Sequence, residues 1–234
     1  MINTAIILAG GLGTRLQSVV KDLPKSMADI AGKPFLEYQL NYLESQEINH
    51  IIFSVGYKYE PIQSYFGNRF KGIELQYAIE KEPLGTGGAV INAIGLCKED
   101  AVFIVNGDTF YPVPLDNLFY YHCEKKAGIS LALKQMENFD RYGVVNINGH
   151  NAITGFEEKK FRKSGLINGG IYLADVNVLR ALKLPVKFSL EKDLFEKYVD
   201  SVSLYGFSFP QYFIDIGIPE DYARAQTELL AYAN

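Results

Sequence analysis

The sequence predicts an α/β fold in which helices flank a mostly parallel, mixed sheet and a smaller β-rich lobe follows. Two observations predict it. In the N-terminal half, short apolar runs alternate with helical patterns, which is typical of βαβ units with right-handed crossovers. Past residue 127 the pattern changes to strand-like segments joined by turn signals, which indicates a β-rich insertion.

The first half supplies the predicted parallel sheet. Apolar runs of strand length predict strands, and amphipathic segments between them predict helices. The first helix opens on Pro34, a residue favoured in the first helical turn. The strands are expected at 3–9, 49–56, 73–80 and 101–106, and the helices at 34–46, 59–66 and 86–97.

The second half supplies the β-rich lobe and a closing helix. Asn148-Gly149 is the strongest signal in the chain for a two-residue hairpin turn. No repeat or linker interrupts residues 1–234, so we expect a single domain with two lobes. The strands are expected at 128–136, 142–156, 168–174 and 202–216, the helical stretches near 175–183 and 189–199, and the final helix at 219–232.

Composition and charge exclude several classes of protein. A net charge of −4 and a pI of about 5.5 give no electrostatic basis for broad nucleic-acid binding, although local cations suffice for a nucleotide. Cys97 and Cys123 show neither metal-ligand spacing nor a disulfide framework. The N-terminal apolar run is too short to span a bilayer and follows no basic leader, so we expect a cytoplasmic protein with no membrane partner.

A glycine-rich loop follows the first predicted strand. Residues 10–16 read Gly-Gly-Leu-Gly-Thr-Arg-Leu, and Pro24-Lys25 follows. Glycines let backbone N–H groups converge on an anion, and the arginine and the lysine add the charge that phosphates require. The loop lacks the third glycine of the dinucleotide fingerprint and the Gly-Lys-Ser/Thr of the NTPase P-loop. We predict a polyphosphate site, the alternative being a tight turn with a solvent-facing arginine.

A second glycine-rich segment, residues 80–89, reads Glu-Lys-Glu-Pro-Leu-Gly-Thr-Gly-Gly-Ala. It lies where a predicted strand gives way to a helix, so its free N–H groups are expected to face a ligand. Loops that follow strands of one parallel sheet open on the same crevice, where α/β proteins bind ligands. The alternative for this segment is a flexible connection.

Two aspartates follow apolar strands in the same way. Asn106-Gly107-Asp108 ends the run 101–105, and residues 213–217 repeat the order of apolar strand, aspartate and glycine around Asp215. Each aspartate alone is commonly a turn or cap residue. Together, facing a triphosphate, they predict an Mg²⁺ site, because Mg²⁺ favours a few carboxylates completed by phosphate oxygens and water.

Two clusters in the second half identify no site by themselves. Residues 156–160 read Phe-Glu-Glu-Lys-Lys, which is compatible with a solvated strand end. Asn168-Gly169-Gly170 places an amide and two glycines at a predicted strand start, and asparagine suits sugar hydroxyls because it both donates and accepts. His50, His122 and His150 are assigned no role.

In this order the motifs resemble the sugar-1-phosphate nucleotidyltransferase family. The resemblance implies a Rossmann-like fold of the nucleotide-diphospho-sugar transferase type. It also implies a nucleotide-binding lobe mainly in 1–127, a sugar-binding lobe mainly in 128–217 and a C-terminal helix at 219–232. The matching segments span almost the whole chain and are 10–16, 24–25, 82–89, 106–108, 142–143, 158–159, 168–169 and Asp215.

The resemblance implies attack of a sugar 1-phosphate oxygen on the α-phosphorus of a nucleoside triphosphate, with loss of pyrophosphate. The nucleophile is already anionic near neutral pH, since the second pKa of a phosphate monoester is about 6. No catalytic base is therefore needed. Catalysis depends on in-line placement of two anions and on neutralisation of the developing charge.

The resemblance also implies residue roles. Arg15 would stabilise the departing pyrophosphate, Lys25 would bridge the α-phosphate and the sugar phosphate, and Lys159 would hold the sugar phosphate. Asp108 and Asp215 would carry Mg²⁺. Further nucleotide contacts are expected from Leu8, Gly10, Gly11, Gly13, Thr14, Glu80, Pro83, Gly85 and Thr86, and further sugar-phosphate contacts from Asn106, Tyr142, Gly143, Glu158, Asn168 and Gly169.

The chain departs from the family pattern at three places. Ser26 replaces the proline that often follows Pro24-Lys25, and Ile218 stands where a threonine often follows Asp-Ile-Gly. The sequence ends soon after Asp215 without a hexapeptide-repeat β-helix, so we expect no acetyltransferase activity.

Glu80 favours GTP as the donor nucleotide. Relatives that transfer pyrimidine nucleotides tend to have glutamine here, which donates and accepts, whereas a carboxylate only accepts. Guanine presents two adjacent donors, N1–H and N2–H₂, to one carboxylate, whereas uracil presents one N–H flanked by carbonyls. The alternative is a surface glutamate at a strand end.

The sugar is less constrained. Residues 80–89 and the short chain resemble the D-glycero-α-D-manno-heptose 1-phosphate guanylyltransferases within the family. Mannose 1-phosphate, or N-acetylmuramate 1-phosphate with UTP, stays open as an alternative. A catalytically silent regulator that binds sugar nucleotides is an alternative of another class, disfavoured by the presence of both cations and both aspartates. The tyrosine-rich helices are compatible with a homodimer.

Overall fold

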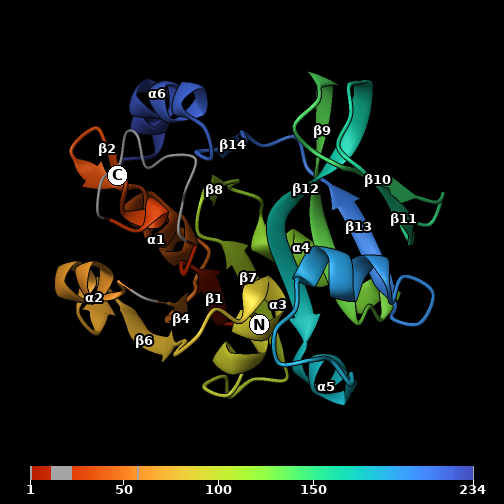
Figure 1. The fold of residues 1–234 in the computed structure, drawn as a ribbon, viewed down its shortest axis with the longest axis horizontal. Helices are drawn as coiled ribbons and strands as arrows, with labels where there is room; N and C mark the ends of the chain where they lie inside the picture. The colour runs from red at the N-terminus through yellow and green to blue at the C-terminus, as the bar shows by residue number, and fades with distance from the viewer. Residues whose placement is uncertain (1, 12–22, 57, 234) are drawn as a thin grey trace.

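A computed structural model describes residues 2–11, 23–56 and 58–233 (Figure 1). The centre of its sheet consists of the four predicted parallel strands. β1 pairs with β4 on one side and with β7 on the other, and β6 pairs with β4. Because the strand order reverses at β1, the loops that follow β1 and β7 diverge and leave a crevice at their carboxyl ends. The strands are β1 (Thr4–Leu8), β4 (His50–Val55), β6 (Ile73–Ile79) and β7 (Ala101–Asn106).

Helices cover both faces of this sheet (Figure 1). Strand residues alternate between two cores. Ile7 belongs to the core that includes residues of α1, α2, α4 and α6, whereas Ile6 belongs to the core that includes residues of α3, α5 and the π-helical segment η3. The bounds are α1 (Phe35–Ser45), α2 (Glu60–Phe66), α3 (Gly85–Ala93), α4 (Leu115–Lys125), α5 (Val176–Ala181), η3 (Leu190–Glu196) and α6 (Pro219–Glu228), followed by the 3₁₀ segment η4 (Leu229–Tyr232).

α4 was not among the predicted helices. Its buried residues are Leu115, Leu118 and His122. A histidine therefore occupies a buried position where an apolar residue would normally indicate the helix. His122 Nδ1 lies 2.9 Å from the buried Ser130 hydroxyl, and burial lowers the pKa of the imidazole. Three consecutive aromatic residues at 119–121 also precede the histidine, so the helical period does not stand out in the sequence.

The second half joins the same sheet. β12 (Arg162–Asp175) runs antiparallel to β7, with Ile171 opposite Val105, and β9 (Ile129–Phe139) pairs with β12 and with β13 (Leu204–Ser208). β10 (Val144–Ile147) and β11 (Ile153–Glu157) complete one edge. β12 is longer than the predicted 168–174, and its register shifts between Asn168 and Tyr172. The glycines at 169 and 170 thus lie in a mid-strand irregularity and not at a strand start.

The turn at Asn148-Gly149 differs from the two-residue hairpin that was predicted. Ile147 pairs with Ile153, so residues 148–152 form the loop. The Asn148 side chain accepts hydrogen bonds from the backbone N–H groups of His150 and Ala152. The asparagine therefore stabilises a longer loop through its side chain instead of adopting the expected tight turn.

The strands predicted within 202–216 are two short, separate strands. β13 ends before Pro210, which cannot donate to a ladder, and β14 (Ile214–Asp215) pairs with β8 (Thr109–Phe110). Asp215 consequently lies opposite Thr109. The remaining elements are η2 (Lys25–Met27), β2 (Asp29–Ile30), β3 (Lys33–Pro34) and β5 (Arg69–Phe70). No helix in the described part of the chain has the length and apolar character of a membrane span.

Candidate active site

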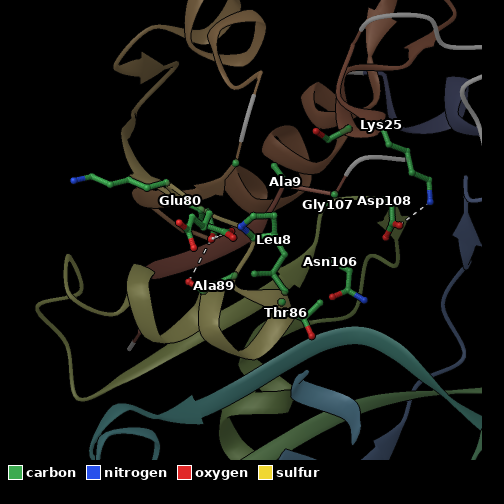
Figure 2. Close-up of a pocket in the computed structure, with 18 residues that line it drawn as sticks. Leu8, Ala9, Lys25, Glu80, Thr86, Ala89, Asn106, Gly107 and Asp108 are labelled. Carbon is green, nitrogen blue, oxygen red and sulfur yellow. Dashed lines mark hydrogen bonds and ion pairs between the residues drawn. The ribbon is translucent and has the colours of Figure 1, made fainter. Parts of the chain in front are cut away.

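A cavity of about 440 Å³ opens at the carboxyl ends of the parallel strands (Figure 2). Glu80 lies on one side of it, and Lys25 with Asp108 lies on the other. The predicted residues that line it are Leu8, Gly10, Gly11, Lys25, Glu80, Pro83, Gly85, Thr86, Asn106 and Asp108. Gly13, Thr14 and Arg15, the rest of the predicted phosphate loop, fall outside the described residues.

The cavity also has lining residues to which the sequence analysis assigned no individual contact. Ser54 lies near the carboxyl end of β4, the parallel neighbour of β1, and Gly56 follows that strand, so the position of strand ends could have identified both. Gly107 approaches the backbone of β1 closely, because a Cβ there would lie 2.5 Å from the carbonyl oxygen of Leu8. The others are Ala9, Ser26, Lys81, Glu82 and Ala89.

Lys25 joins the two aspartates that the sequence separates by 107 residues. Its Nζ lies 2.6 Å from Asp108 Oδ2 and 3.4 Å from Asp215 Oδ1. The lysine side chain is only 10% exposed, so its ammonium group depends on these carboxylates in place of water. The predicted cation and both predicted metal carboxylates therefore meet at one point. Lys25 and Asp108 line the cavity there, whereas Asp215 is not among its lining residues.

Local structure holds the two aspartates in place. β8 and β14 pair antiparallel directly after Asp108 and at Asp215, which sets the two backbones side by side. Gln39 of α1 donates from one amide nitrogen to the carbonyl oxygens of Asn106 and Thr109, at 2.8 and 2.7 Å, and so secures the turn between β7 and β8. The backbone is thus fixed before any ligand binds.

Electrostatics at Asp215 reflect this crowding. Burial raises the pKa of its carboxyl group, and the nearby charge of Asp108 raises it further, whereas Lys25 and the N–H of Gly217 act in the opposite direction. The Gly217 N–H donates to Asp215 Oδ1 at 2.7 Å. A buried carboxylate beside a second carboxylate favours a nearby cation, and a perturbed group of this kind is common at active sites.

Glu80 is anchored at the opposite side of the cavity. Its Oε2 accepts a hydrogen bond from the Leu84 N–H at 3.0 Å, and its Oε1 accepts from the Ser54 hydroxyl at 3.4 Å. A Cβ on Gly10 would lie 3.3 Å from Oε1, so the carboxylate sits against the start of the glycine loop. Glu80 is therefore a fixed acceptor beside the cavity and not a free surface side chain.

The second glycine segment differs from its prediction in one respect. The N–H groups of Gly87 and Gly88 do not face a ligand, because both lie near the carbonyl oxygen of Phe188, at 3.0 and 3.4 Å. The Phe188 ring occupies the space that a Cβ on Gly87 would need. Packing against residues 186–188 thus accounts for part of the glycine pattern, while Gly85 and Thr86 still line the cavity.

Thr86 connects the cavity to η3. Its hydroxyl oxygen accepts a hydrogen bond from the Leu190 N–H at 2.9 Å and donates to Glu191 Oε2 at 3.0 Å. The neighbouring Lys192 lies 3.9 Å from Glu158. These contacts extend from the cavity wall toward Glu158 and Lys159, which are predicted to contact the sugar phosphate.

The predicted sugar-phosphate residues do not lie together: Asn106 lines the cavity, and the others lie in three further places. Tyr142 lies near Asp215. Burial is the largest cause that raises the pKa of the Tyr142 phenol to about 12, and the charge of Asp215 is the next. Gly143 lies against the carbonyl oxygen of Glu157. Asn168 already binds internally, since it donates to the Tyr172 hydroxyl and accepts from the Gly170 N–H. Gly169 packs against Tyr111.

Glu158 and Lys159 lie in an exposed loop between β11 and β12. They do not line the cavity of Figure 2, so the structure does not bring them to Lys25 and the aspartates. Their predicted roles stay predictions.

Within residues 2–11, 23–56 and 58–233, no three His, Cys, Asp or Glu side chains gather as a ready-made metal site. Asp108 and Asp215 nevertheless fit Mg²⁺, which needs only one or two protein carboxylates when phosphate oxygens and water complete its shell. The approach of both carboxylates to one ammonium group shows that they can share a cation.

A family model for nucleotidyl transferases matches residues 4–231. The chain belongs to the nucleotidyl transferase family. It is therefore an enzyme of nucleotide transfer, and its mixed sheet flanked by helices is the fold of that family. Members of the family generally use a divalent metal.

Relatives within the family match over nearly the full chain. A D-glycero-alpha-D-manno-heptose 1-phosphate guanylyltransferase from Aneurinibacillus thermoaerophilus is 50% identical over 97% of this chain and 99% of its own. A protein of the same description from Campylobacter jejuni is 50% identical over 93% and 96%. The crystal structure of HddC from Yersinia pseudotuberculosis complexed with GMP-PN has a TM-score of 0.88 and 35% identity, over 97% of this chain and all of that one.

Proposed function

We propose that this enzyme transfers GMP from GTP to D-glycero-α-D-manno-heptose 1-phosphate and releases pyrophosphate. The observation that carries the proposal is the meeting of Lys25, Asp108 and Asp215, of which Lys25 and Asp108 line one side of a cavity that holds Glu80 on the other. The two relatives at 50% identity support the choice of base and sugar. The reaction uses a nucleoside triphosphate as the donor. The cytoplasmic location and the homodimeric state of the enzyme stay predictions.

The chemistry requires no proton-abstracting group. A phosphate oxygen of the sugar 1-phosphate forms a bond to the α-phosphorus of GTP, and the bond from that phosphorus to the bridging oxygen of pyrophosphate breaks. Lys25 would bind oxygens of both reacting phosphates and hold them in line. Asp108 and Asp215 would hold Mg²⁺, which supplies charge neutralisation to the phosphate oxygens when bound.

Glu80 would select guanine. Its carboxylate is fixed by the Leu84 N–H and has no donor hydrogen, so it favours a base edge with two adjacent donors. Uracil would bring carbonyl oxygens toward the same negative charge. A hydrogen bond to a charged group contributes about 1.5–3 kcal/mol, enough for a preference of roughly tenfold or more.

The test is pyrophosphate release by the purified enzyme with Mg²⁺, each nucleoside triphosphate and a panel of sugar 1-phosphates. We expect activity with GTP and the heptose 1-phosphate, and its loss in EDTA. Glu80→Gln should weaken the preference for GTP, whereas Glu74→Gln, on the exposed side of β6, should leave it unchanged. A preference for mannose 1-phosphate, or for UTP with N-acetylmuramate 1-phosphate, would overturn the proposed substrates, and no activity with any pair would favour a regulator.

A further inference from the structure

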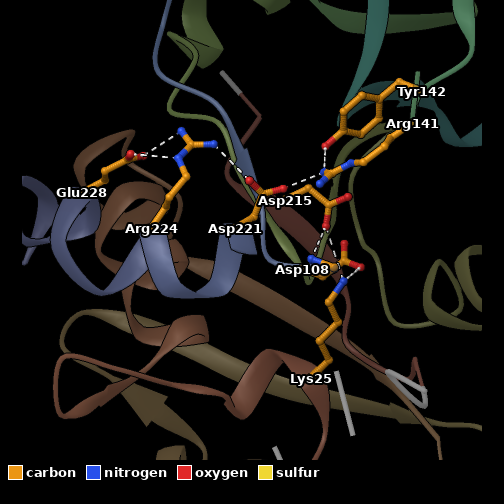
Figure 3. A network of polar contacts seen from close by, with 9 residues as sticks. Lys25, Asp108, Arg141, Tyr142, Asp215, Asp221, Arg224 and Glu228 are labelled. Atoms are coloured by element: carbon orange, nitrogen blue, oxygen red, sulfur yellow. Dashed lines mark hydrogen bonds and ion pairs between the residues drawn. The ribbon is translucent and has the colours of Figure 1, made fainter. Parts of the chain in front are cut away.

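The loop between β9 and β10 is joined to the first turn of α6 by a single arginine (Figure 3). Arg141 Nη2 lies 2.6 Å from Asp221 Oδ2 and donates to the Tyr142 hydroxyl at 2.7 Å. The guanidinium carbon lies 5.3 Å from the centre of the Tyr142 ring. One side chain therefore binds both a helix terminus and a neighbouring phenol.

Asp221 needs such a partner because it is buried, with only 8% of its surface exposed. Its second oxygen, Oδ1, accepts from Arg224 Nη1 at 3.0 Å, and Arg224 in turn binds Glu228. A buried carboxylate with both oxygens paired is stable where an unpaired one is costly. The two arginines thus share Asp221, but only Arg141 also binds Tyr142.

The start of α6 has no side-chain cap of its own. Ile218 occupies the N-cap position and offers no acceptor, and the helix begins at Pro219. The strand that carries Asp215 leads directly into this turn. The ion pair between Arg141 and Asp221 therefore ties the β9–β10 loop to the connection that carries one of the two cation-binding aspartates.

Tyr142 also packs against the segment that carries Asp215 and leads into α6. Its ring meets Phe213 edge-on at 5.9 Å, and Phe213 lies two residues before Asp215. Phe213 also meets the buried Tyr111 ring edge-on at 5.6 Å. Tyr142 is thus held by Phe213 on its ring and by Arg141 on its hydroxyl.

We propose that Arg141 is a positioning residue that holds Tyr142 beside Asp215 for binding of the sugar 1-phosphate. It does so by pairing with Asp221 while donating to the phenol, so that the loop and the helix terminus keep one relative position. The inference rests on the proposed function, since it takes the sugar phosphate to bind near Tyr142. It assigns no contact between Arg141 and either substrate.

The two arginines on Asp221 provide a matched test. Arg141→Gln should raise KM for the sugar 1-phosphate about tenfold and leave KM for GTP within about twofold, because the cavity of Figure 2 does not include this loop. Arg224→Gln removes the other partner of Asp221 without touching Tyr142, and should change neither KM by more than about twofold. Arg141→Lys keeps the charge but has a single donor group, so its KM for the sugar 1-phosphate should lie between the values of the wild type and Arg141→Gln.

A double-mutant test with Tyr142 distinguishes a role of Arg141 in positioning Tyr142 from a role in stabilising α6 alone. In the background of Tyr142→Phe, Arg141→Gln should add little to KM for the sugar 1-phosphate, because the bond between the two residues is already lost. Equal effects of Arg141→Gln and Arg224→Gln, or equal rises in both KM values, would overturn the inference. If Arg141→Gln fails to fold, the same two KM values are compared for Arg141→Lys, alone and in the background of Tyr142→Phe.

The two proposals fail in different ways. Absence of activity in the wild-type enzyme with GTP and every sugar 1-phosphate contradicts the proposed function. Full wild-type activity with an unchanged KM for the sugar 1-phosphate in Arg141→Gln contradicts only the inference about Arg141.

Discussion

Gly217 lies close to the carboxylate pair and leaves little space for a side chain. A Cβ there would lie 2.8 Å from Asp215 Oδ1 and 3.1 Å from Lys25 Nζ. Even alanine must therefore displace one of the two charged groups. The glycine after Asp215 is a requirement of the site and not only of the turn.

Gly217→Ala should lower kcat by roughly 10- to 100-fold, since small displacements of reacting groups have effects of this size. Steady-state kinetics measures the loss, and thermal unfolding should show little change. Gly149→Ala is the matched control, because nothing lies within 4 Å of its new Cβ. Equal turnover in the two variants would contradict this account of Gly217.

Asp215→Asn should stabilise the protein at neutral pH while abolishing turnover. Burial and Asp108 raise the pKa of Asp215 above the ordinary value of 3.8, so the folded state favours the protonated form. The ionised carboxyl group therefore costs stability above its folded pKa. Below the ordinary value the group is neutral in both the folded and the unfolded chain, and the advantage of the amide disappears.

Thermal unfolding in EDTA between pH 3 and pH 8 measures this dependence. The difference in Tm between Asp215→Asn and wild type should be positive at pH 7 and shrink as the pH falls. The exposed Asp200, replaced in the same way, should show no such trend. A variant that is less stable than wild type at pH 7 would refute the expectation.

At the scale of single residues, sequence reasoning identified the charged groups but not all their environments. Lys25, Asp108 and Asp215 were predicted because charged residues follow apolar strands. Arg141 and Asp221 were not, because a lone arginine before Tyr142 and an acidic residue in a first helical turn carry no distinguishing pattern. Their significance arises only from a contact across 80 residues of sequence.

At the scale of elements, α3 depends on the segment that follows α5. The Phe188 ring fills the space above Gly87, and its carbonyl oxygen accepts from the helix N-terminus. The glycine pattern predicted a ligand at this terminus, whereas two of its N–H groups bind the chain itself. Sequence alone could not reveal this, since Phe188 lies about 100 residues away.

Phe188→Ala should destabilise the protein by about 3–5 kcal/mol, as is usual for loss of a buried phenylalanine. It should also raise KM for GTP, because Gly85 and Thr86 line the cavity on the same turn. Urea unfolding and steady-state kinetics measure the two effects. Val186→Ala, at a side chain that is 80% exposed, should change stability by less than about 0.5 kcal/mol. Similar losses in both variants would exclude the packing role of Phe188.

At the scale of the whole molecule, one sheet extends through both halves of the chain. β12 pairs with β7 across the boundary predicted between the lobes, and Tyr111 donates to the carbonyl oxygens of Leu133 and Phe209 within the second half. The lobes therefore share backbone pairing and a buried core. We expect them to unfold together.

Urea unfolding should show one transition, with coincident midpoints by far-ultraviolet circular dichroism and tyrosine fluorescence, since the chain has no tryptophan. Tyr111→Phe should lower the free energy of unfolding by about 1–3 kcal/mol without separating the two signals. Tyr120→Phe, at a side chain that is 64% exposed, is the control. Two resolved transitions would show that the lobes are independent domains.

Hydrophobic periodicity and glycine-rich strand ends are local properties, so the order of residues was enough to predict the alternating elements, the parallel core and the residue types of the site. The irregularity of β12 between Asn168 and Tyr172 and the longer loop at Asn148 were not predicted. Only the tertiary structure decided which charges meet: Lys25 with both aspartates, and Arg141 with Asp221 and Tyr142. The physical reason is that burial and ion pairing depend on distances between segments far apart in the chain.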